Sequence, residues 1–167
     1  MINIFNNDTH MVSVIHDFMT QHECDNILQY SLPKMEPSMV VSSDGKGQKH
    51  HARTGSNTWL PHNTNDVILN VATRLSETVR MPLENAEPFQ VVHYGEGQEY
   101  SYHYDSFEKN DAHYNEKYVS PQGGQRLVTA LGYLRDVPKG GETGFNKLGV
   151  NIQPKQGTVV ILSLIHI

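Results

Sequence analysis

Cysteine is almost absent from this chain. Cys24 is the only cysteine among 167 residues, which excludes an internal disulfide. Disulfides persist in oxidising compartments, so a chain without them fits a reducing compartment better. The N-terminal stretch also lacks the basic segment followed by an apolar segment that marks a signal peptide. We therefore expect a cytoplasmic protein.

Long apolar runs and an excess of basic charge are also missing. No apolar run approaches the roughly 20 residues that a membrane-spanning helix needs. Lys and Arg together number 13 against 18 Asp and Glu, a formal net charge of -5. A nucleic-acid backbone attracts basic proteins, so this balance argues against it as the main partner. We expect neither a membrane nor a nucleic acid as partner, and the composition indicates no oligomeric state.

The chain has the length and the 37% hydrophobic content of one ordinary domain. Thr20 and Glu23 form a T-x-x-E capping box, which predicts a helix that starts there and ends near Pro33. A second helix is expected from Asn65 to Arg80. Short strands separated by turns are expected at VSVIHDF, FQVVHY, YSYHYD, QRLVTALGYL, GVNIQ and TVVIL. The pattern predicts a mainly β domain with N-terminal helices (α+β), built as a sandwich or a barrel.

His103 and Asp105 stand two residues apart in the stretch QEYSYHYDSF. On a strand, such residues point to the same face, so an imidazole and a carboxylate would converge on one point. These are two of the three ligands in the facial triad that holds non-haem Fe(II). The spacing alone is weak evidence, because His and Asp are common polar residues near turns.

Three longer blocks strengthen this interpretation: VVHYGEGQEYSYHYDSF, GGQRLVTALGYLRDVPKGGETGF and VNIQPKQGTVVIL. Together they resemble the catalytic core of the prolyl 4-hydroxylases, which are Fe(II)- and 2-oxoglutarate-dependent dioxygenases. The similarity runs from about Val12 to Ile161, with the blocks in the family's order. It implies a double-stranded β-helix (jelly-roll) fold and the cofactors Fe(II), 2-oxoglutarate and O2, with L-ascorbate as an optional addition.

The resemblance also implies a role for individual residues. His103 and Asp105 match the first two iron ligands, and Tyr100 matches a tyrosine close to the metal and the substrate. Strict strand alternation would put Tyr100 on the opposite face from His103, so a break in the strand is needed before Ser101. Tyr94 and Tyr133 match tyrosines at the cosubstrate pocket, and Thr129 is placed beside them because it shares a strand face with Tyr133. The resemblance puts Arg53 and Arg126 on the substrate side. Solvated arginines and core tyrosines are the structural alternatives.

The family's third iron ligand is a histidine beyond the strand that starts at GTVVIL, followed by a basic residue that anchors 2-oxoglutarate. This chain has neither after Ile161, and His166 does not fit the pattern. The tail LSLIHI reads as the translated end of a transposase adapter used in sequencing libraries. We therefore expect one incomplete dioxygenase domain at residues 1–161, without its last strands and inactive as it stands, and a non-native tail at residues 162–167.

For the parent protein, the resemblance implies hydroxylation of a peptidyl proline, coupled to decarboxylation of 2-oxoglutarate to succinate. The partner is then a proline-containing peptide or protein. Two alternatives stay open: a non-catalytic β-helix binding module, and an oxygenase that acts on another amino-acid side chain. A nucleic-acid demethylase on the same fold is disfavoured by the acidic charge balance.

Overall fold

The computed structural model describes residues 2–6, 11–38, 40–41, 47–48, 54–106 and 124–163. Its α-helices are α1 (Gln21–Ser31) and α2 (Asp66–Val79). Short 3-10 helices occur elsewhere along the chain: η1 (Leu32–Lys34), η2 (His62–Thr64), η3 (Leu83–Asn85) and η5 (Asn146–Leu148). Its strands are β1 (Ile2–Asn6), β2 (Met11–Ile15), β3 (Glu36–Pro37), β4 (Val40–Val41), β5 (Gly47–Gln48), β6 (Ser56–Leu60), β7 (Phe89–His93), β8 (Val128–Gly132), β9 (Thr143–Phe145), β10 (Val150–Ile152) and β11 (Val159–Ser163).

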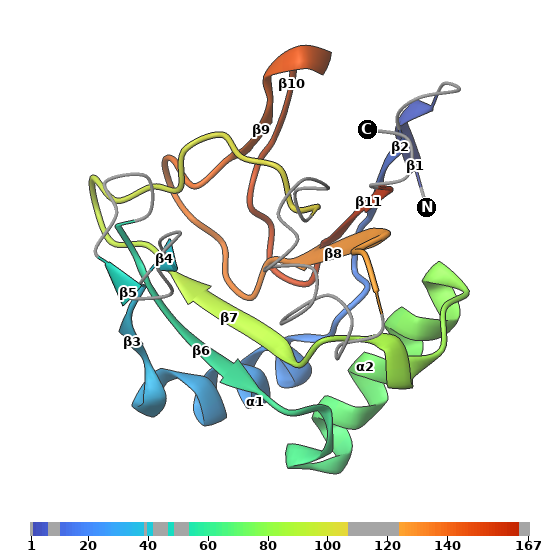
Figure 1. Cartoon of the computed structure of the whole chain (residues 1–167). Coiled ribbons are helices and arrows are strands. Elements are labelled where there is room, and N and C mark those ends of the chain that lie inside the picture. The colour runs from blue at the N-terminus through green and yellow to red at the C-terminus, as the bar shows by residue number, and fades with distance from the viewer. Residues whose placement is uncertain are drawn as a thin grey trace.

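The strands form antiparallel sheets (Figure 1). The largest sheet has the order β1-β2-β11-β8, and a second sheet has the order β3-β6-β7. β9 and β10 make a hairpin that projects away from the helices, and β4 pairs with β5. Within the described residues these sheets do not close into a barrel. The expected combination of helices with antiparallel sheet is confirmed.

β11 is the central strand of the largest sheet, because it pairs with β2 on one side and β8 on the other. Its residues are buried on both faces. Val159 and Ile161 pack toward one core cluster, whereas Val160 and Leu162 pack toward a second one. This explains why the strand reads as a continuous apolar run. β11 continues past Ile161 through Leu162 and Ser163, and residues 164–167 lie outside the described part of the chain.

The first helix begins as its capping box predicts. The Glu23 amide donates to Thr20 Oγ1 over 3.3 Å, and the Thr20 amide donates to Glu23 Oε2 over 2.8 Å. The helix ends at Ser31, and η1 carries the chain through Pro33. The predicted start and end of α1 are both confirmed.

The second helix is also capped by the residues that the sequence indicates. Asn65 Oδ1 accepts from the amide of Ile68, and Arg80 closes the helix in the left-handed conformation with φ 56°. Asn65 Nδ2 donates to Asn26 Oδ1 over 2.9 Å, so the cap of α2 is tied to α1. Neither helix of the described chain is both long and apolar enough to cross a membrane.

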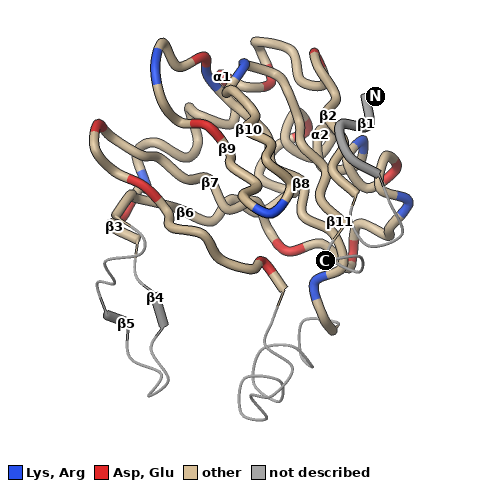
Figure 2. Tube along the Cα trace, turned by 90° about the horizontal axis from the view of Figure 1, so that it is seen from above, with Lys and Arg blue, Asp and Glu red and all other residues tan. Residues whose placement is uncertain are grey.

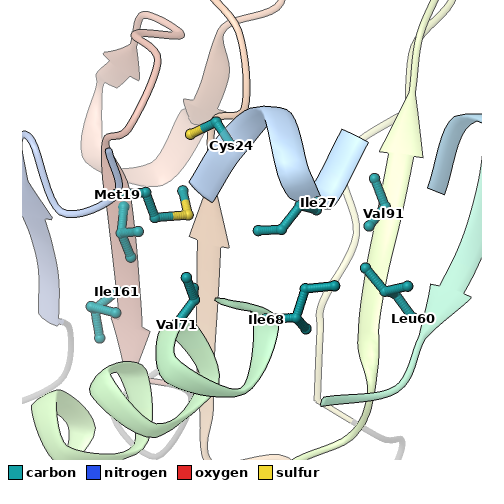
Figure 3. Packing of buried hydrophobic residues seen from close by; sticks show 9 residues of the cluster. Met19, Cys24, Ile27, Leu60, Ile68, Val71, Val91 and Ile161 are labelled. Atoms are coloured by element: carbon teal, nitrogen blue, oxygen red, sulfur yellow. The ribbon is translucent and has the colours of Figure 1, made fainter. Parts of the chain in front are cut away.

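The main hydrophobic core joins both helices to both larger sheets (Figure 3). Ile27 from α1 and Ile68 from α2 lie between Leu60 and Val91 of the small sheet and Ile161 of the large one. The opposite face of the large sheet packs on the β9-β10 hairpin through Val12, Val14, Val160, Leu162 and Ile152. The helices therefore fix how the two sheets stand relative to each other. The candidate site lies where the chain leaves β7, next to the start of β8.

Candidate metal centre

The segment that carries the candidate ligands follows directly after β7. The amide of Gly95 donates to Gln98 Oε1 over 2.7 Å, which closes the turn, and the amide of Thr54 donates to the Glu99 carbonyl over 3.0 Å. From Ser101 to Ser106 the backbone is irregular and pairs with no described strand. The prediction of a strand over YSYHYD is therefore wrong, because none of the described strands offers this segment a hydrogen-bonding edge.

His103 and Asp105 nevertheless converge. His103 Nε2 lies 3.1 Å from Asp105 Oδ1, and His103 Nδ1 lies 2.8 Å from the Ser101 carbonyl oxygen. A carbonyl can only accept, so Nδ1 carries a proton, and Nε2 in turn donates to the Asp105 carboxylate while no metal is bound. Nε2 is therefore the nitrogen that can bind a metal in place of its proton. Two ligands that hold one ion at about 2.1 Å and at right angles are about 3.0 Å apart. The separation of Nε2 and Oδ1 fits neighbouring positions around a single ion.

Tyr100 lies directly against the imidazole. Its ring centroid is 3.6 Å from that of His103, with 17° between the planes. The strand break that the sequence required before Ser101 is present, because the irregular backbone turns Tyr100 to the same side as His103. The tyrosine ring shields one face of the candidate ligand from water.

Two residues near the start of β8 hold Asp105. Thr129 forms a side-chain hydrogen bond with the carboxylate, and Arg126 Nη1 donates to the Asp105 backbone carbonyl over 3.2 Å. The hydrogen bond from His103, helped by Thr129 and by the charge of Arg126, lowers the pKa of Asp105 despite its partial burial. Asp105 therefore stays a carboxylate, the form that binds a metal ion.

Tyr102 and Tyr104, which alternate with the candidate ligands along the chain, anchor the segment on the β9-β10 hairpin. A Cβ atom on Gly144 of β9 would lie 3.2 Å from the Tyr102 hydroxyl oxygen, so the Tyr102 ring sits closely on that glycine. Lys147 Nζ, in η5, donates to the Tyr104 hydroxyl over 2.9 Å. Tyr102 and Tyr104 thus contact the hairpin, while the two residues that alternate with them meet each other.

The two tyrosines expected at the cosubstrate pocket have different surroundings. Tyr94, just after β7, is 37% exposed and its ring lies flat on Gly55, where a Cβ atom would approach Cδ1 of that ring to 2.6 Å. Tyr133, just after β8, donates its hydroxyl to Thr143 Oγ1 over 2.6 Å. Burial raises the pKa of Tyr133, so its phenol is neutral.

The donor set fits two positions of an iron site. An imidazole nitrogen and a carboxylate oxygen suit Fe(II), and the Ser101 carbonyl fixes the ring in the way common for metal-bound histidines. Within the described ranges, no three His, Cys, Asp or Glu side chains are grouped to hold a metal ion. Arg53, the other expected substrate residue, lies outside the described part of the chain.

Sequence reasoning missed two contributors to this site. Ser101 acts through its backbone carbonyl, which no side-chain pattern can reveal. Glu87 forms a bidentate ion pair with Arg126, although the two residues are 39 positions apart. Only the folded arrangement of β7 and β8 brings that pair together. The guanidinium of Arg126 donates to Glu87 and to the Asp105 carbonyl, and the substrate contact expected for Arg126 stays a prediction.

Comparison with known families and curated proteins follows the same line. The sequence model of the 2OG-Fe(II) oxygenase superfamily matches residues 89–166. Probable prolyl 4-hydroxylase 10 of Arabidopsis thaliana is 34% identical over 169 residues, covering 89% of this chain and 56% of that protein. Prolyl 4-hydroxylase 5 of the same plant is 38% identical over 140 residues, covering 83% of this chain and 46% of that protein. The chain spans about half the length of these curated relatives.

Solved structures give a similar result. The viral collagen prolyl hydroxylase of Paramecium Bursaria Chlorella virus-1, in complex with 2OG, superposes with a TM-score of 0.66 at 25% identity. The match covers 91% of this chain and 77% of that one. A Pseudomonas putida prolyl-4-hydroxylase shares the fold, with a TM-score of 0.56 at 17% identity, over 93% of this chain and 82% of that one.

Proposed function

Because this chain belongs to the 2OG-Fe(II) oxygenase superfamily, we propose that its protein is an Fe(II)- and 2-oxoglutarate-dependent dioxygenase that hydroxylates a peptidyl proline. The observation that carries the proposal is the 3.1 Å approach of His103 Nε2 to Asp105 Oδ1, with Nδ1 bound to the Ser101 carbonyl. We also propose that the two larger sheets are parts of a double-stranded β-helix, as the likeness to solved prolyl hydroxylases suggests.

The proposed reaction divides the work between cofactor and protein. Bound Fe(II), together with O2, supplies an oxidation in which one oxygen atom enters the proline C–H bond and the other enters the succinate left when 2-oxoglutarate loses CO2. The protein holds and shields the ion. His103 and Asp105 bind it, Ser101 accepts the Nδ1 proton and so directs Nε2 toward the ion, and the stacked Tyr100 ring covers one face of the imidazole.

Tyr94, Thr129 and Tyr133 remain our candidates for the wall of the 2-oxoglutarate pocket. Tyr94 presents a half-exposed ring next to the candidate ligands' segment, and Thr129 touches Asp105 through its side chain. The Tyr133 hydroxyl is already engaged with Thr143, so its contribution would come from the ring or from a shared hydrogen bond. Arg53 remains a candidate for binding the substrate, and L-ascorbate a candidate for keeping the iron reduced.

An extended, proline-rich peptide suits this surface. Tyr102 is 69% exposed and Tyr104 is 66% exposed, on the rim beside the candidate ligands. Aromatic rings are what proline-rich segments in the polyproline II conformation dock against. A free amino acid would not need such a rim, and aromatic rings favour a proline-rich peptide over a peptide that presents another side chain.

Nucleic acid is a poorer candidate partner. Lys and Arg are scattered among Asp and Glu along the described chain and form no continuous basic stripe there (Figure 2). A non-catalytic binding module is also less well supported, because a surface that only binds peptide has no need for an imidazole that a backbone carbonyl orients toward a carboxylate.

The direct test is turnover of a proline peptide by the full-length parent protein. That protein is incubated with Fe(II), 2-oxoglutarate, ascorbate and a proline-rich peptide, or with a matched peptide in which alanine replaces proline. We expect succinate and a peptide heavier by one oxygen atom only with the proline peptide. His103→Ala should abolish both products, and His22→Ala, an exposed change on α1, should not. Undiminished succinate from His103→Ala would contradict the proposal.

A further inference from the structure

Arg126 uses its guanidinium to join three segments that are distant in sequence. Nε donates to Glu87 Oε1 over 2.5 Å and Nη2 donates to Glu87 Oε2 over 2.8 Å. Nη1 donates to the backbone carbonyl of Asp105 over 3.2 Å. Glu87 lies between η3 and β7, Arg126 precedes β8, and Asp105 lies in the irregular segment between them.

The geometry makes Arg126 a rigid donor. A guanidinium paired with a carboxylate through two parallel hydrogen bonds has a fixed orientation, so the direction of its third nitrogen is fixed as well. Glu87 thereby determines where Nη1 points, and that point is the carbonyl of the candidate metal ligand. Both side chains are about one-third exposed, 37% for Arg126 and 31% for Glu87.

The segment from Ser101 to Ser106 needs such support. It forms no ladder with any described strand, so its backbone is not aligned by a sheet. The orientation of Asp105 depends instead on individual hydrogen bonds, of which the one from Arg126 holds the main chain. A ligand whose backbone can rotate presents its carboxylate to the metal only part of the time, and affinity falls in proportion.

We propose that Glu87 and Arg126 form a clamp that positions Asp105 for metal binding. This inference rests on the proposed metal-dependent function, and it gives Arg126 a role inside the protein beside the substrate contact that its sequence position suggests. Glu87 and Arg126 are positioning residues, because they act through Asp105 and are not themselves ligands.

The chain contains a matched control. Arg74 donates from Nη1 and Nη2 to the two carboxylate oxygens of Glu23, each over 3.0 Å, so it also forms a bidentate pair, although end-on where Arg126 pairs through Nε and Nη2. That pair connects the start of α1 to α2. Glu23→Gln therefore removes a comparable ion pair without touching the segment of His103 and Asp105.

The experiment measures Mn2+ affinity by electron paramagnetic resonance of the free ion. Outer-shell partners of metal ligands typically contribute about 10- to 100-fold to affinity. We expect Arg126→Gln to weaken Mn2+ binding about tenfold and Glu87→Gln to weaken it by a smaller factor, while Glu23→Gln stays within about twofold of wild type. Arg126→Lys keeps the charge but loses the planar fork, so it should also weaken binding and serves if Arg126→Gln does not fold.

The exchanged pair Glu87→Arg with Arg126→Glu separates positioning from simple stabilisation. It keeps an ion pair but removes the donor from beside the Asp105 carbonyl, so unfolding stability should recover while Mn2+ affinity should not. A second readout is the NMR spectrum of the metal-free protein. The chemical shift of the Ser106 amide nitrogen, which belongs to the same peptide group as the Asp105 carbonyl, should change in Arg126→Gln and not in Glu23→Gln.

The outcomes divide clearly. If Arg126→Gln binds Mn2+ as tightly as wild type while His103→Ala binds it more weakly, the clamp is overturned and the proposed function stays intact. Recovery of affinity together with stability in the exchanged pair would also overturn it. Wild-type protein that binds Mn2+ no better than His103→Ala would contradict the proposed function itself, and the positioning role with it.

Discussion

A single backbone carbonyl decides which nitrogen of His103 is available. Ser101 accepts from Nδ1, and the opposite nitrogen faces Asp105 Oδ1 at 3.1 Å. The spacing of His103 and Asp105 was not sufficient to predict a metal site, since a histidine and an aspartate two residues apart are commonly solvated. The ring orientation that Ser101 fixes, the short approach and the lowered pKa of Asp105 together distinguish this pair from a surface pair.

The ring of Tyr100 should contribute measurably to metal affinity. Stacking between aromatic rings is worth about 0.5 to 1.5 kcal/mol beyond area burial. Tyr100→Ala, which removes the stack on His103, should therefore weaken Mn2+ binding by about 2- to 12-fold. Tyr100→Phe keeps the ring and serves as the control, with affinity close to wild type. Equal affinities for the two variants would show that the stack does not organise the imidazole.

At the scale of elements, the sequence predicted those features that local chemistry determines. The capping box of Thr20 and Glu23 marked the start of α1, Pro33 marked its end, and apolar runs marked β7, β8, β10 and β11. β1 and β9 were missed, because short strands with mixed composition acquire their state from pairing with β2 and β10. The segment from Ser101 to Ser106 shows the opposite case. Its residues favour a strand, but no described strand pairs with it, so it stays irregular.

The capping box of α1 makes stability depend on pH. Burial alone would raise the pKa of Glu23, but hydrogen bonds from Arg74 and Thr20 outweigh it and lower the pKa below its ordinary value. The charged form is thus favoured in the folded state, and its contribution is present above the unfolded-state pKa and lost as pH falls through the folded-state pKa.

Glu23→Gln keeps the capping geometry and removes the charge. At neutral pH it should lower the free energy of unfolding by about 1 to 2 kcal/mol, as expected for a charge-assisted hydrogen bond. The difference from wild type should shrink as the pH falls through the folded-state pKa of Glu23. Urea unfolding at several pH values measures it, and a constant difference at all pH values would contradict the assignment.

Gly157 allows the turn before β11 to pack on the entrance to α1. Its φ is +79°, its carbonyl accepts from the Met19 amide over 3.0 Å, and a Cβ atom there would collide with the Met19 carbonyl oxygen. Gly157→Ala should lower unfolding stability by about 3 kcal/mol or more, from backbone strain plus overpacking.

Gly149 is the matched control for that change. Its φ is +64°, but a Cβ atom would meet nothing within 4 Å. Gly149→Ala should therefore cost only the strain of the left-handed conformation, about 1 to 2 kcal/mol. Equal losses for the two alanine variants in thermal or urea unfolding would refute the close packing of Gly157 on Met19.

In the whole molecule, α1 and α2 position the two larger sheets, and the candidate site lies on the chain between these sheets in sequence, after β7 and before β8. The core of α1 and α2 holds the β6-β7 sheet and the β8-β11 sheet at fixed positions (Figure 3). The candidate ligands enter from the end of β7, and their supports come from the start of β8. The sequence could indicate the ligands by their spacing and by family resemblance, but not the clamp, because Glu87 and Arg126 meet only once both sheets are in place.

The most direct test of the account is iron binding with 2-oxoglutarate under anaerobic conditions. A 2-oxo acid that chelates Fe(II) in a protein site gives a visible charge-transfer absorption, which needs no substrate and no turnover. We predict this absorption in the wild-type protein and in His22→Ala, and its loss in His103→Ala. Absorption of equal strength in His103→Ala would show that the ion binds elsewhere and would contradict the site described here.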